Sequence, residues 1–87
     1  MSTNITPKLP SGWLVSRNGE QMILFIKDPM SHKKMAKFYI DSWYARNGNR
    51  SKFRNRRIVS QDDAIRTWNN LIKDGWGKVQ PLLNSVA

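Results

Sequence analysis

Six cationic side chains crowd into one short polar segment of the chain, and no acidic side chain lies among them. The segment reads RNGNRSKFRNRR and covers residues 46–57. Its cations are Arg46, Arg50, Lys52, Arg54, Arg56 and Arg57. Five of the six are arginine, whose planar guanidinium pairs with phosphate through two hydrogen bonds and stacks on bases. Solvated surfaces ordinarily mix charges of both signs, so a cluster of one sign indicates an anion-binding surface.

Aromatic side chains accompany these cations. Phe53 lies in the middle of the segment, and Trp43 and Tyr44 precede it. Adjacent residues on a strand point to opposite faces, so either Trp43 or Tyr44 is expected to be exposed. A surface aromatic beside cations suits nucleobases. The candidate nucleic-acid-binding residues are therefore Arg46, Arg50, Lys52, Phe53, Arg54, Arg56 and Arg57, with Trp43 and Tyr44 beside them.

Other chemistry finds little support in the sequence. His32 is the only histidine and the chain has no cysteine, so no tetrahedral metal site is expected. Asp62 and Asp63 are adjacent and suit the first turn of a helix better than an acid/base pair. Nothing resembles a nucleophile with its base. The chain is predicted not to be an enzyme, with no catalytic residue, cofactor or small-molecule substrate.

The elements that must position the basic segment can be read from local patterns. Asn18-Gly19 separates two apolar runs and predicts a hairpin with a type I′ turn. The unbroken apolar run at residues 22–26 is typical of a central strand or one covered on both faces. Residues 34–46 carry both a helical and an alternating period; the trio at residues 38–40 favours a strand, with a helix as the alternative. The basic segment after them is expected to form a loop.

A helix is predicted at about residues 61–74. Ser60 is its expected N-cap, with Asp63 in a capping-box-like position. Apolar residues recur at helical spacing on one face, and Trp68 among them is expected to face the core. Gly75 follows where a left-handed C-cap would end the helix.

These elements predict an α+β fold, in which three antiparallel strands, or four with a short one at residues 57–59, are packed by one C-terminal helix. Residues 12–80 are expected to form a single domain. A disordered lead-in is expected at residues 1–11, and a loose tail at residues 81–87.

Two motifs resemble those of a small uncharacterised Trp-rich domain family of marine cyanobacteria and their phages. They are GWL at residues 12–14 and R-I-x-S-x-x-D-A-x-x-x-W-x-x-L-x-x-x-G-W at residues 57–76. The resemblance covers about residues 12–77 and implies no activity. This chain departs from the family pattern in having Asp63 where Glu is frequent, and in the strongly basic stretch before Arg57.

The whole chain is basic, with a net charge of +9 and a pI near 10.5. It is therefore expected to bind polyanions. We expect a small nucleic-acid-binding or nucleic-acid-associated accessory protein for RNA or DNA, largely independent of sequence. The alternative is an adaptor or inhibitor that docks on an acidic protein. The longest apolar run is too short to span a membrane. The N-terminus lacks a secretory pattern and cysteine is absent, so a cytoplasmic location is expected.

Overall fold

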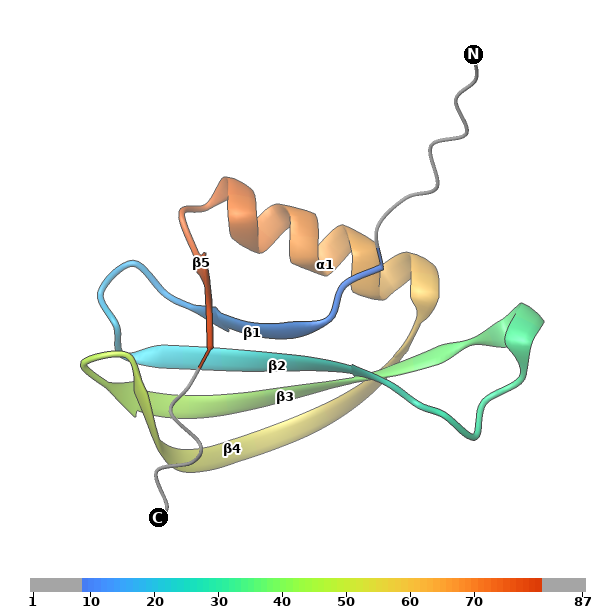
Figure 1. Cartoon of the computed structure of the whole chain (residues 1–87), viewed down its shortest axis with the longest axis horizontal. Coiled ribbons are helices and arrows are strands. Elements are labelled where there is room, and N and C mark those ends of the chain that lie inside the picture. The colour runs from blue at the N-terminus through green and yellow to red at the C-terminus, as the bar shows by residue number, and fades with distance from the viewer. Residues whose placement is uncertain (1–8, 81–87) are drawn as a thin grey trace.

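Five strands form one antiparallel sheet, and a helix lies across one of its faces (Figure 1). The computed structural model of the chain describes residues 9–80. In chain order the elements are β1 (Gly12–Val15), β2 (Gln21–Lys27), the short 3-10 helix η1 (Lys33–Met35), β3 (Lys37–Arg46), β4 (Asn49–Ser60), α1 (Gln61–Lys73) and β5 (Gly77–Val79). The sheet order is β4-β3-β2-β1-β5. The α+β class with a C-terminal helix is confirmed, but the sheet has five strands rather than three or four.

The basic segment is a strand, which corrects the prediction of a loop. Asn47 and Gly48 both have positive φ, 53° and 77°, as a type I′ turn requires. This turn brings Asn49 back beside Arg46, and β4 then pairs with β3 along its length. The side chains of a strand alternate between faces, so the like charges are divided between the two sides. The end of β4 includes the short fourth strand expected at residues 57–59. β5 was not expected; it has only three residues and pairs with β1.

The first hairpin is confirmed, but its turn is not of type I′. Asn18 is not among the positive-φ residues, whereas Gly19 has φ 75°. The Gly19 N–H donates to the Ser16 carbonyl at 2.9 Å. The Asn18 side-chain oxygen accepts from the Glu20 N–H, also at 2.9 Å. The loop between β1 and β2 is longer than the two residues of a type I′ turn, and among its residues only Gly19 has positive φ.

The main core lies between the sheet and α1. Its buried members are Leu14, Phe25, Ala36, Phe38, Ile40 and Ala64. Trp68 packs against them, with its ring edge-on to Phe25 at 5.0 Å between centroids, so the predicted orientation of Trp68 is confirmed. The predicted central position of β2 is also confirmed, because two strands lie on each side of it.

The ends of α1 agree with the predicted caps. The Ser60 hydroxyl accepts from the Asp63 N–H at 3.2 Å, and Gly75 has φ 99°. The Asp63 carboxylate pairs with Arg66 at 2.7 Å. Within the described part of the chain, no helix is long and apolar enough to cross a membrane. The predicted tail at residues 81–87, and residues 1–8 of the predicted lead-in, lie outside the described residues.

Candidate nucleic-acid interface

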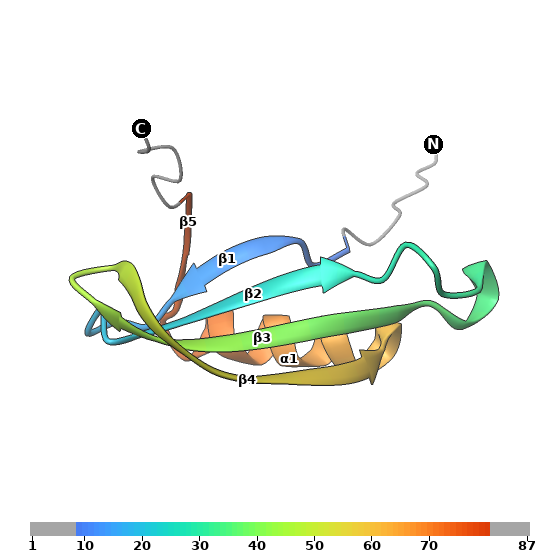
Figure 2. The same cartoon turned by 90° about the horizontal axis from the view of Figure 1, so that it is seen from below.

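The two faces of the sheet differ in what covers them. α1 lies on the face that carries Leu14 and Phe25; we call the opposite side the open face. Figure 2 looks onto the open face, with α1 behind the strands. Cross-strand partners share a face, so the register between β3 and β4 places Trp43 with Phe53 on the open face and Tyr44 with Lys52 on the other. The candidate aromatics are therefore divided between the two sides.

Trp43 belongs to a packed cluster on the open face. Its ring lies 6.2 Å from that of Trp13 and 5.3 Å from that of Phe53, measured between centroids. The Arg50 guanidinium carbon lies over both tryptophans, 5.1 Å from the Trp13 centroid and 5.4 Å from the Trp43 centroid. The Trp43 indole N–H is buried without a hydrogen-bond partner. Trp43 is thus packed within the fold rather than presenting a free ring, and the exposed Arg50 is in contact with two of the packed rings.

Trp13 was not among the predicted site residues. It comes from β1, which is separated from β4 by two strands, yet Arg50 of β4 reaches its ring. Two register irregularities near Trp43 and Ala45 bend the β3–β4 hairpin, because bulges increase the local twist of a strand pair. Trp13 and Leu14 are consecutive residues of β1, so their side chains point to opposite faces of the sheet. Only the sheet order shows that Trp13 meets the basic strand.

Tyr44 and Phe53 are the exposed aromatics of the candidate site, at 49% and 46% of their maximum. The expectation that one of Trp43 and Tyr44 is exposed is therefore met by Tyr44. The Arg54 guanidinium carbon lies 4.9 Å from the Tyr44 ring centroid, and Lys52 is the cross-strand neighbour of Tyr44. A shallow groove of about 360 Å³ runs beside the ring, between the two hairpin turns. Tyr44, Lys52 and Arg54 form a unit of one half-exposed ring with one cation over it and a second cation on its cross-strand neighbour.

Arg56 has a different role from the other cations. Its Nε and Nη2 donate to the two oxygens of Asp41 at 2.7 and 2.9 Å. Asp41 is only 5% exposed, so the pair neutralises a buried carboxylate. The hydrogen bonds to Asp41 raise the pKa of Arg56 above its ordinary value, whereas desolvation acts in the opposite sense. The stabilisation from this shift is present at all lower pH and would be lost only as the pH rises through the raised pKa of Arg56. Arg56 is thereby occupied within the fold, which counts against its predicted phosphate contact.

The remaining basic side chains of the segment have no carboxylate partner among the described residues. They are Arg46, Arg50, Lys52, Arg54 and Arg57. The hairpin that carries them is held in place at its tip, because the Gly48 N–H donates to the Gly19 carbonyl at 3.2 Å and the Ala45 N–H to the Glu20 carbonyl at 2.8 Å. Figure 1 shows the turns of both hairpins at the same end of the sheet. The cations therefore project from a fixed support.

The position of β4 supplies a structural reason for its charge. β4 is an edge strand of the sheet. Charged side chains and bulges at such an edge discourage pairing with other chains, and β4 has both. Edge protection explains why cations are present on this strand. It does not explain why two of them flank an exposed tyrosine.

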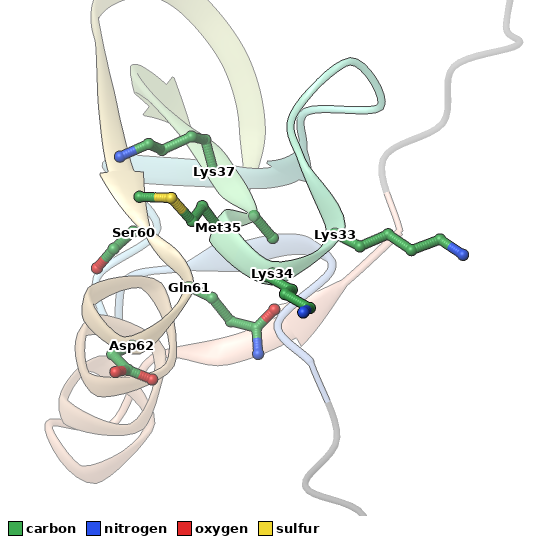
Figure 3. Close-up of a pocket in the computed structure, with 8 residues that line it drawn as sticks. Lys33, Lys34, Met35, Lys37, Ser60, Gln61 and Asp62 are labelled. Carbon is green, nitrogen blue, oxygen red and sulfur yellow. The ribbon is translucent and has the colours of Figure 1, made fainter.

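A second cationic region lies where η1 meets the start of α1, but its lysines do not converge. A cleft of about 280 Å³ is lined by residues 33–37 and 60–62. Figure 3 shows Lys33 and Lys37 pointing away from each other on opposite sides of the cleft. His32 is exposed, and its Nδ1 accepts from the Lys34 N–H at 3.1 Å. No cluster of three metal-binding side chains occurs in the described part of the chain.

Comparison with known proteins yields one match. The model of the family described as "Protein of unknown function (DUF1651)" matches residues 11–82. A search of curated proteins and a search of solved structures found no match. The matched span includes every strand and helix from β1 to β5. The expected likeness to a small uncharacterised domain family is confirmed at this level.

Proposed function

As this chain belongs to the DUF1651 family, we propose for it a function that its own surface supports: it is a small accessory protein that binds nucleic acid largely without regard to sequence. The observation that carries the proposal is the half-exposed Tyr44 ring beside Arg54 and its cross-strand neighbour Lys52, neither of which has a carboxylate partner among the described residues. Rings that stack on bases, beside cations that contact phosphates, are the usual parts of a single-strand binding surface.

The groove beside Tyr44 suits a base better than a phosphate. Glu20 is among the residues that line it, and a carboxylate repels phosphate. The phosphates would instead follow the cations of the β3–β4 hairpin that have no carboxylate partner among the described residues and are not over the tryptophan rings: Arg46, Lys52, Arg54 and Arg57. This role involves binding and no catalysis, and we propose a cytoplasmic location. The paired GWL and R-I-x-S motifs further suggest a source among marine cyanobacteria or their phages.

The charge component can be tested by titrating a short fluorescent single strand at several salt concentrations. Four phosphate contacts predict a slope of about −3 in a plot of log affinity against log salt. Replacing Lys52→Gln together with Arg54→Gln should flatten the slope by about 1.4 units. The matched control is Lys33→Gln with Lys34→Gln, which removes the same charge from exposed lysines of η1. An equal loss in both double variants, or no binding at low salt, would contradict the proposal.

The stacking component is tested by Tyr44→Leu. This change should weaken binding of the single strand by about tenfold, because stacking contributes about 1 to 3 kcal/mol per base. Binding of a duplex of the same length should hardly change, because its bases are already stacked. Met30→Ala, which truncates an exposed apolar side chain far from the hairpin, is the control for the loss of apolar surface. An equal effect of Tyr44→Leu on both nucleic acids would show that Tyr44 takes no part in stacking.

A further inference from the structure

The outer edge of β4 has unpaired backbone groups over its regular part. Within residues 9–80 no strand pairs with this edge. Two hydrogen bonds fix the direction of the groups on β3: the Ala45 N–H donates to the Glu20 carbonyl, and the Asp28 N–H donates to the Lys37 carbonyl. Backbone groups alternate in direction along an antiparallel strand, so the odd-numbered residues of β3 face β2 and the even-numbered ones face β4.

This alternation continues into β4 through the register. Phe38 pairs with Val59, and Ile40 pairs with Arg57, so the N–H and C=O groups of Val59 and Arg57 point inward to β3. The groups of Arg56 and Ile58, which lie between the inward-facing positions, therefore point outward to solvent. The register irregularities are confined to the other half of the hairpin, before Asn55. Residues 55–59 are thus a regular stretch of edge strand, and no strand among the described residues pairs with its outer side.

Side chains at this edge form an incomplete apolar row. Ile26, Tyr39 and Ile58 are direct cross-strand neighbours on β2, β3 and β4. Ile58 ends the row and is 63% exposed, although it is apolar. On the other face, Arg57 is exposed and has no carboxylate partner among the described residues. A strand of alternating apolar and acidic residues added at this edge would extend the row with its apolar side chains. Its acidic side chains would point to the other face, beside Arg57.

We propose that residues 55–59 of β4 bind an extended acidic peptide by β-strand addition, with apolar and acidic side chains alternating along the peptide. Main-chain hydrogen bonds to the outward groups of Arg56 and Ile58 would hold the peptide, as in other cases of β-augmentation. The peptide's apolar residue lies beside Ile58 and its carboxylate beside Arg57. This site shares Arg57 with the proposed phosphate contacts but includes no residue of the Tyr44 unit, so it goes beyond the proposed binding of nucleic acid.

The positive charge of β4 determines which kind of strand can bind at this edge. β4 contains five cations and no acidic residue: Arg50, Lys52, Arg54, Arg56 and Arg57. A second copy of β4 would bring like charges opposite one another, which destabilises strand pairing. The same cations that keep neutral and basic strands away from an edge attract an acidic one. The partner is therefore an acidic segment of another protein rather than a second copy of this chain.

The probe for this site is a capped synthetic peptide of alternating glutamate and valine, measured by calorimetry and by backbone amide chemical shifts. Saturable binding with shifts centred on residues 55–59 is expected. The control peptide has the same sequence with methylated backbone nitrogens at the positions that face β4. Losing two hydrogen bonds should weaken binding by about tenfold to a hundredfold. Equal binding of both peptides would show attraction of charge alone and overturn the proposal, as would the absence of binding.

Two variants at one position test the backbone of β4 itself. Proline is tolerated on an edge strand where its missing N–H would have faced solvent. Ile58→Pro should therefore fold, and should weaken peptide binding by about threefold to tenfold through the loss of one donor. Ile58→Val keeps the donor and should bind as the parent does. If Ile58→Pro unfolds, the Ile58 N–H faces β3 and the proposal is overturned. Dimerisation of the unaltered protein through this edge would likewise overturn it.

The same variants separate the two binding activities. Ile58→Pro should leave oligonucleotide affinity unchanged, whereas Lys52→Gln with Arg54→Gln should reduce it and leave most of the peptide affinity. If the protein binds no oligonucleotide but discriminates between the two peptides, only the proposed function fails. If it binds oligonucleotide but not peptide, only the edge proposal fails.

Discussion

Neighbouring arginines of one basic stretch have different surroundings and should differ in their effect on stability. Arg56 holds the buried carboxylate of Asp41 through two hydrogen bonds, whereas Arg54 lies over the exposed Tyr44 ring. Arg56→Ala leaves a buried charge without its partner, which is strongly unfavourable. The midpoint of thermal unfolding should therefore fall markedly for Arg56→Ala and little for Arg54→Ala.

A second substitution shows whether the buried carboxylate is the cause. Adding Asp41→Asn to Arg56→Ala removes the unpaired charge, so the double variant should recover part of the lost stability. Non-additivity of this kind is expected for residues in direct contact. Equal melting points for the Arg54 and Arg56 variants would mean that the ion pair contributes nothing, and that Asp41 is solvated in solution.

At the scale of single elements, the turn between β3 and β4 determines whether the basic segment can form a strand. Gly48 has φ 77°, and a Cβ added there would meet open space. Gly77 is equally open but is not in the positive-φ region. Gly48→Ala should destabilise the protein by about 1 to 2 kcal/mol, because a left-handed conformation is unfavourable for L-residues. Gly77→Ala should have little effect. Chemical denaturation measures both, and equal stabilities would contradict the turn geometry.

Elements encoded by nearby residues could be predicted from the sequence. The helix after Ser60 has its cap, its apolar face and its terminal glycine within one continuous stretch. Only the end of β4 coincides with the short strand expected at residues 57–59. The loop expected at residues 46–57 is wrong because this segment has a single apolar residue, Phe53, and its strand conformation depends on pairing with β3 rather than on burial of its own side chains. The type I′ turn was assigned to Asn18-Gly19 instead of Asn47-Gly48. Both turns contain the dipeptide Asn-Gly, and they differ in the length of the loop between the strands: residues 16–20 in the first hairpin and residues 47–48 in the second.

The candidate site was predictable in composition but not in arrangement. Register alone shows that Asp41 meets Arg56, which is 15 residues away. Sheet order alone shows that Trp13 meets Arg50. Both contacts remove cations from the set available to an anion. Contacts between residues that are far apart in the sequence cannot be predicted from the pattern of a short segment.

At the scale of the whole molecule, one sheet supports clusters on both faces. Leu14 and Phe25 pack toward α1, while Trp13 and Met22 point to the open face. Met22 has no exposed surface, so the open face also buries apolar area beneath its aromatic rings. Because both clusters use the same strands, neither can be lost without removing support from the other.

This shared sheet predicts a single cooperative unfolding transition. The four tryptophans divide evenly, with Trp13 and Trp43 on the open face and Trp68 and Trp76 against the core beneath α1. Replacing either pair by phenylalanine leaves fluorescence that reports on one face alone. Both double variants will be less stable than the parent, but within each the fluorescence transition should coincide with loss of far-ultraviolet circular dichroism, as two-state unfolding requires. If Trp13 and Trp43 lose their packing at a lower temperature than the secondary structure, the β3–β4 hairpin opens independently of the helix. The cations around Tyr44 would then lack the fixed support that the proposed binding surface requires.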